Sequence, residues 1–168
     1  MVEQLWAPWR LAYVTGAKPE GCVLCSKLHE ADEAAALVLA RSEHSYVVMN
    51  LYPYNAGHLM VVPTRHVADP TGLEAAEAAD IHDMLCTSLE VVRGAMDPAA
   101  FNVGLNLGSA AGGGIPTHLH WHVVPRWNGD TNFMPVLAET KVMPQHLQTT
   151  YDLLRAGFDA RAKEPTSA

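Results

Sequence analysis

The stretch from His118 to Val124 constrains this chain more than any other segment, because it alternates histidine with apolar residues. As a β-strand, the sequence His-Leu-His-Trp-His-Val-Val would place three imidazoles on one face and apolar side chains on the other. On a helix these side chains would scatter, because positions two apart do not share a face. The two valines and the following Pro125 favour a strand that ends there. Three histidines on one face indicate a metal site or a catalytic site, unless they fall together by chance.

Size and charge narrow the class of protein. The chain has 168 residues, of which 49% are hydrophobic, which suits one compact domain over residues 1–168. The formal net charge of −7 argues against nonspecific binding to nucleic acid or acidic membranes, which normally requires a basic surface. The sequence shows no apolar run of the roughly 18 residues that span a bilayer and no signal-peptide core. We therefore expect a cytoplasmic protein.

Both ends of the chain are expected to lie outside the regular core. Residues 1–20 contain Trp6 and Trp9 among prolines that prevent a long helix or strand. We interpret this segment as an N-terminal arm that packs against the protein's own core or against a partner subunit. Residues 163–168 are expected to form a frayed tail.

Hydrophobic patterning predicts several strands between these ends. The strand patterns cover residues 37–40, 45–51, 57–63, 101–107 and 118–124. The second and third are joined by a turn-rich segment and should pair as an antiparallel hairpin. The acidic, alanine-rich residues 30–36 before them predict a short helix or loop.

Two amphipathic helices are also predicted. The first follows a capping-box pattern from Thr71 to Glu74 and ends at Asp97, which precedes a proline. Its apolar stripe, which should cover one face of the sheet, comprises Ile81, Leu85, Leu89, Val92 and Met96. The stripe of the second helix, which should begin near Pro144, comprises Leu147, Tyr151, Leu154 and Phe158.

The three cysteines are too few for a disulfide framework in a chain of this length. Cys22 and Cys25 form a Cys-x-x-Cys pair, and in a reducing compartment this spacing indicates metal binding or redox chemistry. The pair is only half of a tetrahedral site, so two further ligands would have to come from elsewhere in the fold. Cys86 and His82 lie in the first helix, and we interpret both as structural, because free cysteines are commonly buried.

A glycine-rich loop leads directly into the histidine stretch. It runs from Gly108 to Gly114, follows Asn106 and contains Ser109 and consecutive glycines from Gly112 onward. Consecutive glycines let the backbone approach a ligand closely and turn several N–H groups toward one point, as in anion-binding loops. The alternative is a flexible hairpin loop, and the neighbouring histidines favour ligand binding.

Displacement at phosphorus is the chemistry that the histidines and the glycine loop could serve together. It needs a nucleophile that attacks at neutral pH, a proton donor for the leaving group and fixed dipoles around the phosphate oxygens. His120 is the natural nucleophile, because it stands between His118 and His122, each about 7 Å away along the strand.

The motif His-Leu-His-Trp-His-Val-Val resembles the signature of the histidine triad (HIT) family, in which such a strand serves nucleotidyl transfer and hydrolysis. Asn50 and His58 stand eight residues apart, as the ribose-binding residue and a buried active-site histidine do in that family. Residues 51–59 and 125–130 look like the bacterial branch that includes diadenosine polyphosphate phosphorylases and hydrolases. The resemblance implies an α+β fold with an antiparallel sheet of about five strands, a long central helix and a C-terminal helix. It also implies a homodimer in which the two sheets join.

The same resemblance implies the roles of the candidate residues. His120 would form a covalent nucleotidyl-histidine intermediate, with His122 as donor to the phosphate and His58 as the buried active-site histidine. The implied nucleotide-binding residues are Asn50 for the ribose, Leu51 for the base, Asn106 near the scissile phosphate, Gly113 and Gly114 through their amides, and His122.

The resemblance also completes the cysteine half-site with a structural zinc. In some family members the Cys pair is joined by a histidine after the hairpin and by the first histidine of the triad. The implied zinc ligands are Cys22, Cys25, His66 and His118. Such a closed site would clamp the N-terminal arm to the sheet and orient His118. The alternative is a pair of reduced structural cysteines with His66 in solvent.

The reaction itself stays open at this stage. Sugar-phosphate uridylyltransferases resemble His-x-His-x-Gln at this strand, and His122 stands at the last position here, which disfavours sugar transfer. The glycine loop is one residue longer than in the small nucleoside phosphoramidate hydrolases, which leaves the leaving group open, and the acceptor is either water or phosphate. Two other classes are a nucleotide sensor or scaffold with little catalysis, and a metal-dependent hydrolase that uses the three histidines as ligands.

Overall fold

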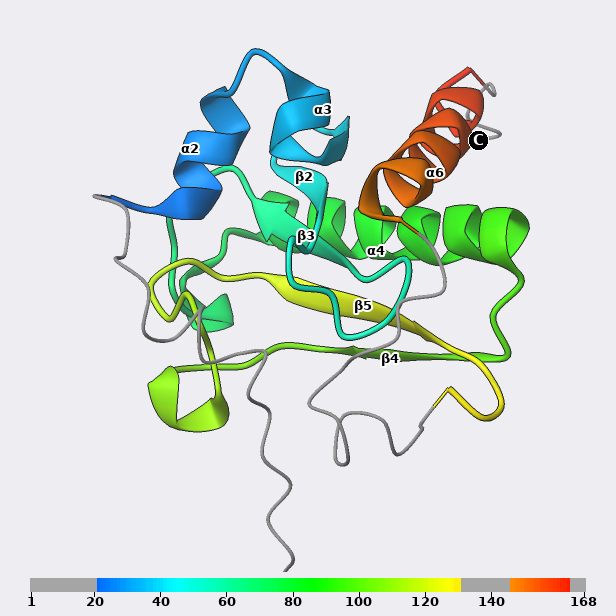
Figure 1. Ribbon diagram of the computed structural model, residues 1–168. Coiled ribbons are helices and arrows are strands. Elements are labelled where there is room, and N and C mark those ends of the chain that lie inside the picture. Colours follow the sequence, from blue (N-terminus) through cyan, green and yellow to red (C-terminus); the bar gives the residue numbers. More distant parts are fainter. Residues whose placement is uncertain (1–20, 131–145, 164–168) are drawn as a thin grey trace, which may run out of the picture.

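The computed structural model describes residues 21–130 and 146–163, and it shows a five-stranded antiparallel sheet with helices packed against it (Figure 1). The strands are β1 (Val38–Arg41), β2 (Ser45–Met49), β3 (Leu59–Pro63), β4 (Ala100–Gly104) and β5 (Trp121–Arg126). Their order in the sheet is β1-β2-β3-β5-β4, and every neighbouring pair is antiparallel. The predicted α+β fold is therefore confirmed, and so is the hairpin of β2 and β3.

The helices are α2 (Val23–His29), α3 (Glu33–Ala36), α4 (Ala75–Met96) and α6 (Leu147–Arg161), with 3₁₀ turns η2 (Pro70–Gly72) and η3 (Ser109–Ala111). The predicted long helix, α4, lies along the sheet and contacts β2, β3 and β5 (Figure 1). α6 packs against α4 and β1. Within the described part of the chain, the helices lack the length and apolar character that a bilayer-spanning segment needs.

β2 and β3 form the centre of the core. Every residue of both strands is buried, so both faces of the sheet are covered at this point. Ile81 and Val92 of α4 and Leu154 of α6 join the same core, as their predicted apolar stripes require. The hydroxyl of the buried Tyr46 donates to the backbone carbonyl of Leu24 at 2.7 Å, which ties α2 to β2.

The start of α4 differs from the prediction. Thr71 belongs to the 3₁₀ turn η2, where its hydroxyl donates to the Asp69 carboxylate at 2.7 Å. The helix begins at Ala75, and the Glu77 carboxylate accepts the N–H of Glu74 at 2.8 Å. The capping box predicted at Thr71 is wrong, because Asp69 holds that side chain in a local turn before the helix starts.

β5 starts later and ends later than predicted. It begins at Trp121, so His118 and His120 precede the regular strand. It continues through Pro125 because β3 no longer pairs with it there, and the missing proline N–H removes no ladder hydrogen bond. The Asn55 side chain instead donates to the Pro125 carbonyl at 3.1 Å.

Cys86 is not buried, contrary to the prediction. It lies with His82 on the exposed side of α4, and its Sγ is 3.7 Å from His82 Nε2. Two other predicted segments lie outside the described residues: the arm over 1–20 and most of the tail over 163–168. The final helix, α6, begins at Leu147, later than the predicted start near Pro144.

Candidate active site and metal centre

A cavity of about 130 Å³ lies where α2, the end of β2, the glycine loop and β5 meet. Of the predicted site residues, those that line it are Asn50, Leu51, Asn106, Gly114, His120 and His122. Gly113 is not in the lining, and its N–H donates to the carbonyl of Gly108 at 3.3 Å. The lining contributed by the described residues contains no carboxylate, which suits an anionic ligand although the whole chain is acidic.

The neutral ring of His120 carries its proton on Nδ1 and leaves Nε2 unprotonated. Its Nδ1 lies 2.7 Å from the backbone carbonyl of His118, which can only accept, so Nδ1 holds the proton and donates it. In the neutral ring, Nε2 then keeps its lone pair. Burial lowers the pKa of His120, although the hydrogen bond to His118 opposes this shift, and the neutral ring is favoured at pH 7. A buried neutral imidazole with a free nitrogen is suited to nucleophilic attack.

His122 has the opposite arrangement, because a chain of hydrogen bonds sets its proton. The N–H of Tyr54 donates to Nδ1 of His58 at 3.0 Å, so His58 carries its proton on Nε2. That Nε2 lies 3.0 Å from Nδ1 of His122 and donates to it. The neutral ring of His122 therefore holds its proton on Nε2, which lies 3.4 Å from the side-chain nitrogen of Asn106. Rotation of the Asn106 amide by half a turn would bring its oxygen to this position, where it would accept the proton.

His58 has a buried, supporting position. Its side chain is fully buried, and the ring of Tyr54 stacks on it with centroids 4.7 Å apart. Its ring centroid lies 5.1 Å from that of His122, and His122 in turn lies 4.9 Å from His120. The three rings thus form a contiguous group in which His58 is behind the cavity and the other two line it.

Asn50 and Leu51 directly follow β2 and line the same cavity. The Asn50 side-chain oxygen accepts the N–H of Tyr52 at 2.9 Å, a local turn that fixes the orientation of its side chain. Leu51 is 52% exposed, so its side chain is available to cover a ligand and does not belong to the core.

Sequence reasoning missed the contribution of α2 to the cavity. Val23, Leu24 and Lys27 line it together with methionines of β2 and β3. Lys27 Nζ donates to the carbonyl of Ala36 at 2.5 Å, and burial lowers the pKa of this lysine. The available signal in the sequence was the position of Lys27, four residues after Val23 and three after Leu24, close to the Cys pair. Residues at these spacings share a helical face.

Sequence reasoning also missed a hydrogen-bond network that joins two distant segments. Arg126 donates twice to the Asp130 carboxylate, at 2.7 and 2.8 Å, and the Asn55 side chain donates to the same carboxylate at 2.9 Å. These bonds join the loop between β2 and β3 to the end of β5. That loop begins at Asn50 and ends at His58, so the hydrogen-bond network helps to position both candidate residues.

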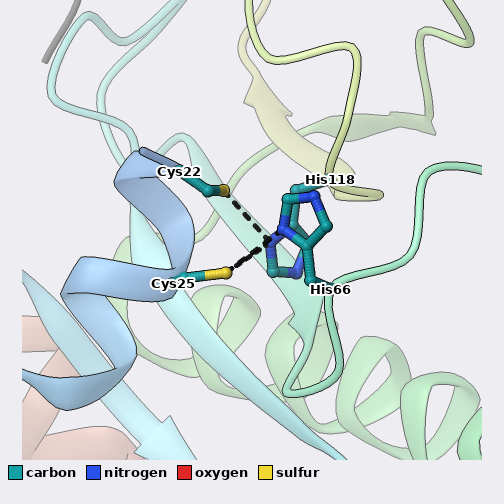
Figure 2. Close-up of side chains that lie close together, drawn as sticks. All are labelled: Cys22, Cys25, His66 and His118. Atoms are coloured by element: carbon teal, nitrogen blue, oxygen red, sulfur yellow. Dashed lines mark hydrogen bonds between the residues drawn. The ribbon is translucent and has the colours of Figure 1, made fainter. Parts of the chain in front are cut away.

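The four predicted metal ligands, Cys22, Cys25, His66 and His118, come together in one cluster (Figure 2). One ligand atom from each lies within 4.8 Å of the others. The Cys22 sulfur is 3.3 Å from Nδ1 of His118, and the Cys25 sulfur is 3.2 Å from Nδ1 of His66. In a tetrahedral zinc site, sulfur and nitrogen ligands lie about 3.5 Å apart. The cluster could therefore hold a metal ion.

The proton position on His118 also fits ligation. Its Nε2 lies 2.9 Å from the carbonyl of Pro63 and donates to it, so Nδ1 is unprotonated and faces the two sulfurs. Burial lowers the pKa of His118, which favours the neutral, ligating ring. The three imidazoles predicted on one face thus divide into two groups, because His118 lies before the regular strand while His120 and His122 line the cavity.

Comparisons with known proteins find a matching family model and similar sequences and structures. A family model described as the HIT domain matches residues 31–129. The chain is 40% identical over 161 residues to a Mycobacterium tuberculosis protein named AP-4-A phosphorylase, covering 91% of this chain and 83% of that protein. It is 31% identical to the bis(5'-nucleosyl)-tetraphosphatase [asymmetrical] of Schizosaccharomyces pombe, covering 55% of this chain and 50% of that one. Its structure is similar to a Zn-bound histidine triad family protein from Mycobacterium smegmatis, with a TM-score of 0.65, 23% identity and coverage of 86% and 98%.

Proposed function

Because the chain belongs to the HIT domain family, we propose that it cleaves nucleoside polyphosphates, chiefly diadenosine polyphosphates, at the α-phosphorus. The observation that carries the proposal is the pair of opposite proton positions at one cavity, a lone pair on Nε2 of His120 and a proton on Nε2 of His122. The names of the relatives, AP-4-A phosphorylase and bis(5'-nucleosyl)-tetraphosphatase, support this substrate class.

In the first step, Nε2 of His120 attacks the α-phosphorus. An N–P bond forms, and the P–O bond to the leaving nucleotide breaks. The Nε2–H of His122 donates a hydrogen bond to the phosphate oxygens and stabilises the negative charge that develops on the leaving oxygen, and the leaving nucleotide departs as a phosphate oxyanion. His58 is a positioning residue, because its N–H keeps the lone pair of His122 occupied at Nδ1. In the second step, an oxygen of water or inorganic phosphate forms a P–O bond to the same phosphorus, and the N–P bond breaks. The electron pair of that bond returns to Nε2 of His120, and when water is the acceptor its proton is released to solvent.

The remaining candidate residues bind the nucleotide in this proposal. Asn50 holds the ribose and Leu51 covers the base, which agrees with their place in the cavity lining and with the exposure of Leu51. Asn106 contacts the substrate near the scissile phosphate, since its side chain lies beside His122. The amides of Gly113 and Gly114 are assigned to the phosphate oxygens, and for Gly113 this requires the loop to release its bond to Gly108.

We assign zinc to the cluster of Cys22, Cys25, His66 and His118. The donor set of two sulfurs and two nitrogens is one that zinc prefers, and the unprotonated Nδ1 of His118 supports the assignment. Four protein ligands leave no open position, so the ion supplies a structural cross-link between α2 and the sheet.

We further propose that the protein is a cytoplasmic homodimer of one domain each and binds a small nucleotide, with no role for nucleic acid or membranes. β4 ends the sheet and pairs only with β5 among the described strands, and such an edge is suited to joining a second sheet. Sedimentation equilibrium at micromolar concentration tests the dimer, and an exclusive 18.2 kDa species would remove it.

The decisive experiment incubates the pure protein with labelled diadenosine tetraphosphate, with and without phosphate. Release of AMP and ATP without phosphate identifies a hydrolase, and release of ADP and ATP that depends on phosphate identifies a phosphorylase. His120→Asn should abolish both. Tight binding of the substrate with no turnover by the wild type would instead identify a sensor or scaffold.

A further inference from the structure

The short helix α2 belongs to the cavity and to the metal cluster at the same time. Cys22 precedes its first residue and Cys25 lies in its first turn, and Figure 2 shows both sulfurs facing the two histidines of the cluster. Val23 and Lys27 of the same helix line the cavity. Residues three and four apart share a helical face, so the cysteines occupy one face and the cavity residues the adjacent one. A movement of the first turn therefore moves the cavity wall.

Among the residues that the structure describes, few other groups anchor the first turn of α2. It spans seven residues, it has no side-chain hydrogen bond at its N-cap, and Leu24 is its one buried residue. The Tyr46 hydroxyl donates to the carbonyl of Leu24, and Arg41 donates to that of Leu28 at the other end of the helix. Val23 and Leu28 are partly buried against the core. Helices this short are not stable alone. The cluster links the first turn to His66, which follows β3, and to His118, which precedes β5. Without a metal, these links are sulfur hydrogen bonds, which are weak.

We propose that the metal-loaded cluster sets the position of α2 and, through it, the affinity of the cavity for the nucleoside end of a nucleotide. This inference rests on the proposed function. Val23 gives the wall its apolar surface for a base, and Lys27 gives it N–H donors for the polar edge of the nucleoside. The Lys27 side chain lines the cavity, and its ammonium group donates to the Ala36 carbonyl at 2.5 Å. The cysteines are positioning residues that act on binding and leave the chemical step unchanged.

The test compares the metal-loaded wild type with Cys22→Ser/Cys25→Ser, and uses Cys86→Ser on the exposed side of α4 as the matched control. Calorimetric titration with AMP should give a Kd about tenfold higher for the double variant. The KM for diadenosine tetraphosphate should rise with it, while kcat changes less than about threefold. Amide hydrogen exchange should accelerate in residues 23–29 and stay slow in β2 and β3. Cys86→Ser should match the wild type in every measurement.

Variants that keep the cluster intact protect the inference against a folding failure of the double variant. Val23→Ala and Lys27→Ala should each raise the AMP Kd by about three- to tenfold with full metal content. An unchanged AMP Kd in the metal-free double variant, or in both cavity variants, would overturn the inference. If the double variant loses exchange protection throughout the sheet, the AMP Kd values of the two cavity variants decide the inference. If the wild type binds no AMP, the proposed function fails as well, and this outcome is distinct from equal binding by all variants.

Discussion

His118 and His120 are two residues apart and have the same side chain, yet their neutral rings carry the proton on different nitrogens, Nε2 in His118 and Nδ1 in His120. His118 donates from Nε2 to the Pro63 carbonyl and turns an unprotonated Nδ1 toward two sulfurs. His120 donates from Nδ1 to the carbonyl of His118 and keeps the lone pair on Nε2, in a residue that lines the cavity. Which carbonyl each ring meets decides whether the residue is suited to hold a metal or to attack phosphorus.

The comparison also shows how the two regions are joined. The ring of His118 belongs to the metal cluster, while its backbone carbonyl sets the proton position of His120. A disturbance of the cluster that leaves this carbonyl in place should therefore spare the chemical step. A disturbance that moves the carbonyl of His118 should slow the chemical step. Substitutions can separate these two effects, and the largest is expected at His120 itself.

His120→Asn removes the nucleophile and keeps a polar side chain of smaller size. We expect kcat for diadenosine tetraphosphate to fall by at least about 10⁴-fold, because the covalent intermediate cannot form. The midpoint of thermal unfolding should stay within about 3 °C of the wild type, since the cluster is untouched. Steady-state kinetics and a thermal melt measure the two quantities. Residual turnover above a hundredth of the wild-type rate would assign the nucleophile elsewhere.

His66→Ala opens the metal cluster and keeps its other three ligands, Cys22, Cys25 and His118. If the protein binds the metal with free metal about 1,000-fold above its Kd, the ion stabilises the fold by about 4 kcal/mol. Loss of the ion should then lower the unfolding midpoint by about 10 °C. Since the carbonyl of His118 stays in place, kcat should change less than about threefold. Elemental analysis and calorimetry check this, with His82→Ala on the exposed side of α4 as control. Unchanged stability after loss of the metal would contradict a structural role.

His58→Phe keeps the shape of the ring and removes the N–H that occupies Nδ1 of His122. The His122 ring can then adopt either proton position, so we expect kcat to fall by about 10- to 100-fold with little change in KM. His58→Gln, whose amide can still donate to His122, should recover part of the rate. Equal rates in both variants and the wild type would show that the chain from Tyr54 to His122 has no effect on catalysis.

The alternating histidines carried most of the information that could be read in advance. They indicated a strand, a phosphorus-directed site and a family, and the family membership and the α+β sheet are confirmed. The cysteine pair indicated half of a metal site, and its two histidine partners came only from the resemblance. The structure brings all four side chains together because β3 and β5 are neighbours, which spacing alone does not state.

The missed features all depend on contacts between distant segments or on competing local bonds. The proton positions of His120 and His122 follow from carbonyl and amide partners that a sequence does not show. The bonds from Asn55 join residues 70 and 75 positions apart, so no local pattern predicts them. The capping box at Thr71 failed for the opposite reason, because Asp69, only two residues away, bound the hydroxyl first. Patterns predict elements well, whereas local competition and long-range contacts decide caps and site chemistry.

The smallest expected effect concerns the ion pair that holds the loop of His66. Arg65 donates to the buried Glu77 carboxylate at 2.6 and 2.8 Å, and this lowers the pKa of Glu77 to about 2. In the unfolded chain the same carboxyl takes up a proton near its usual 4.5. Between these values the unfolded state binds more protons, so the stability from Glu77 is complete above pH 4.5 and is lost as the pH falls toward 2.

Glu77→Gln should therefore lower the free energy of unfolding at pH 7 by about 1 kcal/mol and flatten its decline below pH 4.5. Denaturant unfolding at several pH values measures both quantities. Glu90→Gln is the matched control, because Glu90 lies on α4 as Glu77 does but makes an exposed ion pair, with Arg161 of α6. Turnover at pH 7 should be unchanged in both variants, since Glu77 contacts the loop of the metal cluster and not the cavity. If Glu77→Gln lowered kcat while the metal content stayed full, the loop of His66 would serve the catalytic histidines directly, and the separation of the two regions would fail.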